Sequence, residues 1–400
     1  MANSIVTIDM VTREALRIAH EKCQFIGTTD RQYDDSYAKT GAKIGASLRV
    51  RKPNQYTRTT GSRVMDVQDQ TEQTGTITVA TQDHVDMRFN SAELALSIDE
   101  ISKRYIEPAV SVLVSGIEAD YLAFATKATA NTAGTAGTAI TTLVVPGAAR
   151  AKLNQNLAPK DGNRFIQMDS VTMGGLVNGA AAYFNPGADL TKQYREGIIA
   201  RTAMADYYEN ERMWTLPNSG DVAGEVNNGT LTSGITALTV DGLTAAPVAG
   251  MVFTIEGTFD VHPETKAPYA ALKQFVCSAG CTTTNLVFTP AVIYDTTSAL
   301  QNCSGAPTND DDIAFVGAAS TNYVQSLMYH KEAFQFVTAD LPLMDSSEKC
   351  VRRVQDGLSL RVWQDSDIRN DELLMRIDIL YGMAALRPEW ACRMIGAANA

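Results

Sequence analysis

The sequence predicts an α+β fold that is interrupted by a separate all-β insertion. Outside residues 221–318, apolar residues recur at helical spacing in several stretches, and short alternating segments predict strands. Between Asp221 and Gly317 the composition changes abruptly, with ten acidic residues against two lysines. No arginine occurs between Arg212 and Arg352. A shift of that size indicates a separate module, and its five short strand candidates predict a small barrel or sandwich.

The overall composition excludes several classes of protein. The chain has 400 residues, of which 45% are hydrophobic and 20% charged, so a disordered, collagen-like or coiled-coil protein is excluded. A net charge of −11 argues against generic binding to nucleic-acid phosphates. We expect no membrane span, because no stretch approaches 18 uninterrupted apolar residues. The absence of a signal-peptide pattern and the uneven spacing of six cysteines predict synthesis in a reducing cytosol.

The first ninety residues predict a helix followed by a long ribbon. Residues 9–22 have the pattern of a short amphipathic helix, and residues 30–39 are polar and read as a loop. Alternation over 47–51 and 76–79 predicts two strands joined by a polar segment. The whole ribbon, residues 41–90, has too few apolar residues for a core of its own. A ribbon of this kind is marginal alone and must lie on something.

The ribbon carries two adjoining blocks of opposite charge. Residues 41–65 contain six cations and no acids, whereas 66–86 contain five acids and no lysine or arginine. A single charged run is usually a solvated face, but two opposite blocks also suit contact between copies of one chain. The candidate contact residues are Arg49, Arg51, Lys52, Arg58, Arg63, Asp66, Asp69 and Glu72.

A long apolar helix follows the ribbon. Ser97 to Glu100 fits a capping box that opens a first helix, and Pro108 suits the first position of a second helix over 108–127. Gly116 is a weak point within this helix: it either allows bending or permits close packing against a neighbouring backbone. We expect the apolar stripe to pack on a sheet containing Leu374, Ile377, Ile379 and Leu380. The stripe consists of Val110, Leu113, Val114, Ile117, Tyr121 and Phe124.

The remaining elements alternate between helices and strands. Residues 129–142 are small and repetitive, which predicts a flexible surface loop. Helices are expected over 147–157 and 170–183, with a strand over 164–168 between them. The strand candidates of the module are 235–240, 251–255, 272–277, 285–289 and 313–316. After the module, one element is expected over 329–338 and a strand hairpin over 358–363 and 373–381.

Signatures of catalysis are mostly absent from the sequence. There is no nucleophile elbow, phosphate loop, zinc-protease motif or dinucleotide fingerprint, and the four histidines fall in separate segments. Cys277 and Cys281, with Cys303 and His262, form a weak candidate for a metal cluster. Residues 309–312 (Asn-Asp-Asp-Asp) suit a solvated turn better than a calcium loop. These observations favour a structural or interaction protein without a cofactor over an enzyme.

Four stretches of the chain have motifs similar to those of one known family. The C-terminal YGMAALRPEWACRMIG, with Arg387-Pro388-Glu389, and residues 183–210 resemble the end and the central segment of the major coat proteins of short-tailed bacteriophages of the Salmonella podovirus type. Gly45 to Pro53, followed by Tyr56, resembles the start of their extended loop, and DGLSLRVWQDSDIRNDELLMRIDILYG resembles their closing hairpin. The matching pieces are spread over most of the chain outside the β module.

The resemblance implies the fold shared by tailed-phage and herpesvirus shells. On this chain it implies an N-terminal arm over 1–40, an extended loop over 41–90 and a peripheral domain with a spine helix over 91–142. It further implies an axial domain over 143–220 and an inserted β domain over 221–318. Residues 319–400 complete the axial and peripheral domains, and the final strands are expected to rejoin the peripheral domain.

The resemblance also implies a function and partners. The expected protein is a non-enzymatic major capsid protein that assembles, through a precursor shell that expands, into an icosahedral head around phage double-stranded DNA. Its partners are then other copies in pentamers and hexamers, a scaffolding protein and a portal, without a membrane. The location is the virion, with assembly in the host cytoplasm. Two alternatives are an encapsulin-type bacterial compartment shell and, from another class, a hydrolase or adhesin with a β accessory domain.

Overall fold

The computed structural model describes residues 8–34, 47–58, 60–61, 65, 67, 73–90, 105–180, 205–229, 231–344, 349–355, 357–367, 369–370 and 372–398. The chain divides into two compact units. The first contains residues 1–50, 74–121 and 334–386, and the second contains 51–73, 122–333 and 387–400. The helix predicted to open at Ser97 lies outside the described residues.

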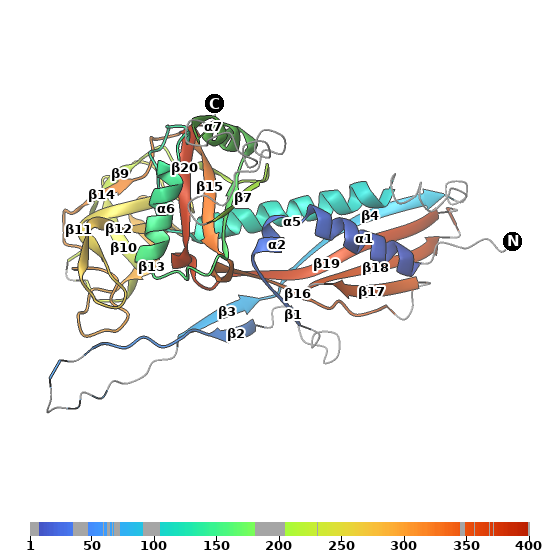
Figure 1. Cartoon of the computed structure of the whole chain (residues 1–400), viewed down its shortest axis with the longest axis horizontal. Coiled ribbons are helices and arrows are strands. Elements are labelled where there is room, and N and C mark those ends of the chain that lie inside the picture. The colour runs from blue at the N-terminus through green and yellow to red at the C-terminus, as the bar shows by residue number, and fades with distance from the viewer. Residues whose placement is uncertain are drawn as a thin grey trace, which may run out of the picture. The chain divides into compact units, whose positions relative to one another are not determined.

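The first unit is built on a mixed sheet. Its strands follow the order β1 (Asp30–Asp34), β16 (Phe334–Ala339), β19 (Glu372–Ala385), β18 (Leu358–Asp367) and β17 (Lys349–Gln355), and β4 (Thr81–Asn90) also pairs with β19. The predicted hairpin is confirmed as β18 and β19. β4 and β17 were not predicted, and the loop expected over 30–39 is wrong for Asp30–Asp34, which form β1 in parallel with β16. The helix predicted over 9–22 is confirmed as α1 (Ile8–Lys22), which lies over β17 and β18 (Figure 1).

Aromatic rings join the helices of this unit to its sheet. The ring of Phe25, in α2 (Phe25–Thr28), lies 4.7 Å from that of Tyr121 on α5 (Glu107–Ala128). Tyr121 in turn lies 5.4 Å from Phe336, and Phe336 stacks on Tyr381 at 5.5 Å. The long helix predicted over 108–127 is confirmed as α5, and the ring of Tyr121 in its second half packs in the interior.

The second unit contains another sheet. Its order is β5 (Thr132–Ala133), β20 (Ala391–Ala398), β15 (Asn322–His330), β6 (Arg164–Met168) and β7 (Asp206–Glu209), with β8 (Thr215–Pro217) paired to β15. Two helices belong to this unit, α6 (Val144–Gln155) and α7 (Ser170–Ala180). Buried side chains of both helices share a core with β6, β15 and β20. The predictions for β6 and for both helices are confirmed within a few residues.

Two predictions for this region are wrong. The stretch 129–142 is not simply a surface loop, because it contains β5, which pairs with β20, and buries Thr129, Thr132 and Ile140. Because its side chains are small, the backbone of this stretch can pair within the sheet. The repetitive composition was therefore not a sign of a solvent-exposed loop. The single element expected over 329–338 is two strands, β15 and β16, separated by a 3₁₀ turn, η4 (Lys331–Ala333). The last strand, β20, was not predicted.

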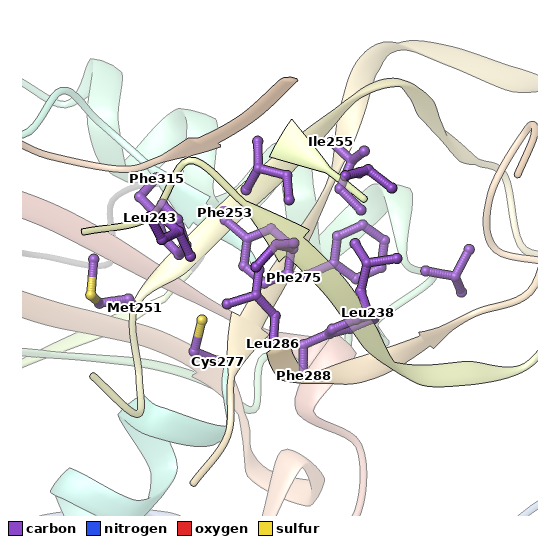
Figure 2. Close-up of a cluster of buried hydrophobic side chains, with 14 of the residues drawn as sticks. Leu238, Leu243, Met251, Phe253, Ile255, Phe275, Cys277, Leu286, Phe288 and Phe315 are labelled. Atoms are coloured by element: carbon purple, nitrogen blue, oxygen red, sulfur yellow. The ribbon is translucent and has the colours of Figure 1, made fainter. Parts of the chain in front are cut away.

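A closed six-stranded barrel fills the predicted module. Its strands are β9 (Ala223–Val226), β10 (Ile235–Asp241), β11 (Val252–Val261), β12 (Pro268–Cys277), β13 (Asn285–Val292) and β14 (Asp312–Phe315), in the order β10-β13-β12-β11-β14-β9. Phenylalanine rings fill the centre, with Phe253 about 5.6 Å from both Phe275 and Phe288 (Figure 2). The five predicted strands are confirmed, and β9 is an additional, short strand. An α+β fold with an inserted β barrel is thus the observed architecture.

Candidate assembly surfaces

Part of the predicted extended loop, 41–90, forms a two-stranded ribbon, whereas its last residues form β4, which pairs with β19. β2 (Ser47–Arg51) and β3 (Thr74–Thr78) form a sheet of their own, and the Lys52 amide extends it by donating to the Gln73 carbonyl at 2.8 Å. Arg49, Arg51 and Arg58 are exposed, and Lys52 is half-buried. The structure therefore places four predicted contact residues along one ribbon. The other four, Arg63, Asp66, Asp69 and Glu72, lie outside the described residues.

Apolar side chains distinguish the two ends of the described ribbon. Tyr56, Met65 and Val67 are 58%, 86% and 77% exposed. At the other end, Ile77 and Val79 are buried in a cluster that also contains Val337, Leu341 and Leu380. The ribbon is therefore anchored at its base, while the described part beyond the base has no core of its own.

Two acidic residues of the 66–86 block form hydrogen bonds or ion pairs within their own chain. Asp83 and Asp86 lie on β4, where the carboxylate of Asp83 accepts a hydrogen bond from the Tyr381 hydroxyl at 2.8 Å. Burial and this hydrogen bond raise the pKa of Tyr381. Asp86 lies 3.0 Å from His84 and 3.8 Å from Arg376. Two of the five acids between residues 66 and 86 therefore have partners in their own chain.

The spine helix α5 presents most of its predicted stripe to the interior. Val110, Leu113, Val114, Ile117 and Tyr121 are buried, whereas Phe124 is only partly buried. Leu122 and Ala125, which the stripe omitted, are completely buried. Among the described residues, α5 is the helix whose length and apolar composition would suffice to cross a membrane, and half of that stretch is buried inside the protein.

The expected partners of the stripe on β19 are only partly correct. Ile379 lines a cavity of about 20 Å³ together with Val110, Leu113, Val114 and Ile117. Leu374, by contrast, is 47% exposed, and Leu380 packs with Ile77 and Val79 at the base of the ribbon. Successive side chains of a strand point to opposite faces, so Leu374 and Leu380 cannot share the face of Ile377 and Ile379.

Glu118 is an important residue of the spine helix that the sequence analysis missed. It is fully buried, and its Oε1 accepts hydrogen bonds from the backbone amides of Phe25 at 2.8 Å and Ile26 at 3.4 Å. These are the first amides of α2, whose N–H groups would otherwise lack acceptors. Glu118 therefore fastens the N-terminal segment to the spine helix. The sequence feature that could have identified this residue is an acidic side chain next to Ile117, within an otherwise apolar helix.

Gly116 lies on the exposed side of the same helix. A Cβ atom added there would meet no atom of the described residues within 4 Å. Close packing against a backbone in the described part of the chain therefore does not explain the glycine. The role of Gly116 as a bending point stays a prediction.

The exposed charged side chains of the barrel are almost all acidic. Of its two lysines, Lys273 is buried and pairs with Asp260 at 2.8 Å, and the Lys266 ammonium donates to the Ala299 carbonyl at 2.5 Å. Glu225 pairs across the strands with both Asp241 and Asp312, so three exposed carboxylates form a row. Like charges directly opposite each other destabilise a sheet.

The sequence candidates for chemistry do not form a metal site within the described residues. No group of three or more histidine, cysteine or acidic side chains there could hold a metal ion. His262 Nδ1 accepts from the amides of Glu264 and Thr265, and Asp311 accepts from the amide and hydroxyl of Thr308. Both residues therefore close local turns.

Comparison with known proteins gives one family match. A family model described as "P22 coat protein - gene protein 5" matches residues 213–396, which extend from just before the barrel into β20. No curated protein matches the sequence.

Solved structures with a similar arrangement were also found. The chain is similar to the capsid of cyanophage P-SCSP1u, with 11% identity, a TM-score of 0.46 and coverage of 93% of this chain and 87% of the other. It is similar to a protein of Mycobacterium phage Che8, with 11% identity, a TM-score of 0.44 and coverage of 90% and 88%. A virus-like particle from Pyrococcus furiosus has 6% identity, a TM-score of 0.37 and coverage of 96% and 98%.

Proposed function

We propose that this chain, whose residues 213–396 belong to the P22 coat protein family, is the structural subunit of a tailed-phage head. The family match is the observation that carries the proposal. It covers the barrel, the closing hairpin and the Arg387-Pro388-Glu389 segment, three regions that were singled out from the sequence. The chain is thus a major capsid protein that acts by self-assembly. Neither the compartment-shell nor the hydrolase alternative has a comparable match.

The proposal extends to the assembly pathway and to the partners of the subunit. Copies of the chain form pentamers and hexamers of a precursor shell, with a scaffolding protein and a portal, and the shell expands when DNA fills it. Work of this kind needs no catalytic site, and we propose that the chain is not an enzyme. The net charge of −11 supports enclosure of DNA without tight binding, because an acidic wall repels phosphates. Assembly then takes place in the host cytoplasm.

The proposed division of labour follows the predicted domains. Residues 1–40 act as the arm, 41–90 as the extended loop, 91–142 as the peripheral domain with the spine helix, and 143–220 as the axial domain. Residues 221–318 are the inserted domain, and 319–400 complete the axial and peripheral domains. The ribbon is the assembly element, since the described part beyond its base exposes cations and apolar side chains, namely Arg51, Arg58, Tyr56, Met65 and Val67.

Charge reversal in the ribbon tests the assembly role. The variant Arg49→Glu/Arg51→Glu/Lys52→Glu should give soluble subunits that do not form shells, because a cationic contact becomes anionic. Light scattering and electron micrographs of purified particles measure shell formation, and urea unfolding of the dissociated subunit measures folding. We expect the midpoint of unfolding to change little, since these side chains lie outside the buried clusters.

A matched control variant distinguishes loss of the ribbon contact from a general effect of the changed net charge on assembly. Lys160→Glu/Lys349→Glu/Arg369→Glu makes the same change in charge at exposed positions outside the ribbon, and it should assemble. Normal shells from the ribbon variant would show that the ribbon is not the contact. A wild-type chain that remains monomeric under all assembly conditions would instead contradict the capsid function itself.

A further inference from the structure

β4 has the longest free edge among the described strands of the chain. It pairs with β19 along ten residues, from Thr81 opposite Tyr381 to Asn90 opposite Glu372, without a shift in register. Within the described residues, neither strand pairing nor another backbone hydrogen bond occupies the opposite edge of β4. Figure 1 shows β4 at one border of this sheet and β17 at the opposite border. The outward N–H and C=O groups of β4 are therefore available to another strand.

This edge lacks the features that usually protect the border of a sheet. In the other sheet, the edge strands β5 and β7 have only two and four residues, and the barrel is closed. β4 contains no proline, glycine or lysine, and its pairing with β19 has no bulge. A long and regular edge of this kind is a template for pairing with another chain.

The exposed side chains of β4 carry charges of both signs. Those of Asp86 and Arg88 are 60% and 69% exposed. Within the chain, Asp86 lies 3.0 Å from His84 and 3.8 Å from Arg376, and Arg88 lies 3.0 Å from Glu372. These ion pairs leave most of both side chains in solvent, so Asp86 and Arg88 can also meet charges of a second chain.

We propose that the β4 edges of two copies of this chain pair antiparallel about a two-fold axis at Met87. Residues 84–90 of one copy then lie opposite residues 90–84 of the other. Asp86 faces the partner's Arg88, and the symmetry repeats this ion pair on the other side of the axis. Hydrogen bonds of the ladder hold the two edges together, and the ion pairs fix the register, because exposed ion pairs alone stabilise little.

Charge distinguishes this register from the neighbouring ones. An axis at Asp86 would place two carboxylates directly opposite each other, which destabilises a sheet. An axis at Val85 would pair Asp86 with His84, which is charged only when protonated, and would leave Arg88 opposite Gln82. Of the three registers, the one at Met87 is favoured because it joins opposite charges on both sides of its centre.

The contact rests on the proposed function, since it joins copies of a self-assembling subunit, and it adds a second contact to that of the ribbon. A two-fold contact is closed, because each copy contributes the same edge and no third copy can be added. Such a contact cannot by itself build a ring of five or six subunits. It would therefore link subunits of neighbouring pentamers or hexamers into one continuous sheet.

Single cysteine substitutions in the full chain test the register. In shells of Met87→Cys the two new thiols lie directly opposite each other, so oxidation with copper phenanthroline should join them. Val85→Cys is the matched control on the same face of the same strand, and its thiols would be about 14 Å apart along the ladder. We expect roughly ten times more disulfide at residue 87 than at residue 85. Mass spectrometry of the joined peptides distinguishes these bonds from any formed by the six native cysteines.

A charge swap tests the ion pairs independently of the fold of each subunit. In the Met87→Cys background, Asp86→Arg places arginines opposite arginines, and Arg88→Asp places acids opposite acids, so each variant alone should lose most of the disulfide. In a mixture of the two variants every facing pair again has opposite charges, and a disulfide between the two kinds of chain should return. The changes within each chain are the same alone and in the mixture, so the recovery reports on contact between copies.

Two results would overturn the contact. Shells that form without a disulfide at residue 87 would show that the β4 edges do not meet, and a stronger bond at residue 85 would contradict the axis at Met87. Equal yields from the single variants and from their mixture would mean that Asp86 and Arg88 do not fix the register. A wild-type chain that forms no shells contradicts the capsid function instead, and the contact is then measured in concentrated subunits, where a missing bond at residue 87 also overturns it.

Discussion

Glu118 shows how a single buried side chain can hold two distant segments together. Its carboxylate accepts from the amides of Phe25 and Ile26, so Glu118→Ala removes their acceptor and leaves a cavity. We expect a loss of about 3 kcal/mol in the free energy of unfolding, measured by urea denaturation of the dissociated subunit. Glu118→Gln keeps an acceptor oxygen and should cost about 1 kcal/mol.

The neighbouring acid supplies the control. Asp120 lies two residues away on the exposed side of the same helix, and Asp120→Asn should change stability by less than about 0.5 kcal/mol. If Glu118→Ala were no more destabilising than Asp120→Asn, Glu118 would not fasten α2 to the spine helix.

Asp161 gives a pH dependence with a definite sign. Burial raises its pKa, but hydrogen bonds from the backbone and side chain of Asn163, together with His330, outweigh burial and lower the pKa of Asp161 to about 2. An unfolded aspartate has a pKa of about 3.9, so between these values the unfolded chain binds more protons than the native one. The stabilisation is therefore complete above about pH 4 and is lost as the pH falls to about 2.

Removal of the hydrogen-bond donor tests this assignment. Asp161 is 44% exposed, so solvent screening limits its contribution to about 0.5 kcal/mol. Asn163→Ala should flatten the stability profile between about pH 4 and 2, measured by urea unfolding at fixed salt. An unchanged acid limb in that variant would mean that Asn163 does not lower the pKa.

At the scale of an element, Gly116 allows a clean test of the spine helix. Because an added Cβ meets open space, Gly116→Ala should stabilise α5 by about 1 kcal/mol through helix propensity alone. Gly147→Ala on α6 is the matched control, because its Cβ also meets nothing within 4 Å. In assembled shells, the bending role predicts that Gly116→Ala, and not Gly147→Ala, raises the temperature needed for expansion. Equal expansion temperatures for both variants would refute bending at Gly116.

Elements with a regular apolar pattern could be predicted from the sequence, and those governed by buried polar groups could not. The stripe of α5 and the alternation of β10 to β14 gave correct helices and strands. β17 and β20 were missed because Arg352, Arg353 and Arg393 interrupt their patterns, although Arg393 is completely buried. β4 was missed although Val85, Met87 and Phe89 alternate, because the intervening residues are charged or polar.

The assembly surface could be predicted only as a region. Charge blocks identified the ribbon, but sequence alone could not show that Asp83 and Asp86 are bound within the chain by partners almost three hundred residues away. Long-range pairing of this kind leaves no local signal. The same reason explains why the role of Glu118 became visible only in the folded chain.

At the scale of the whole molecule, Arg393 connects three distant parts of the second unit. From β20 its Nε donates to the Thr129 carbonyl at 2.7 Å, just beyond the end of α5, and its Nη1 donates to the Gly250 carbonyl of the barrel at 2.6 Å. The Gln274 side chain adds a second link by pairing with the backbone of Thr132. The barrel is therefore joined to the adjacent sheet by polar contacts as well as by Leu216 of β8, which packs in the barrel core.

Polar links of this kind imply that the barrel can fold without its host. Its core cluster consists of residues between Leu216 and Phe315, and water can replace the hydrogen bonds of Gly250 and Gln274 when the host is absent. The fragment 221–318 should therefore show β-type circular dichroism and a cooperative melt. The fragment 213–318 should be more stable by about 2 kcal/mol, because it restores the fully buried Leu216 together with Trp214. Urea unfolding of both fragments measures the difference. Equal stabilities would place the boundary of the barrel core at residue 221, and a disordered spectrum for both would mean that the barrel needs Arg393 and the host sheet to fold.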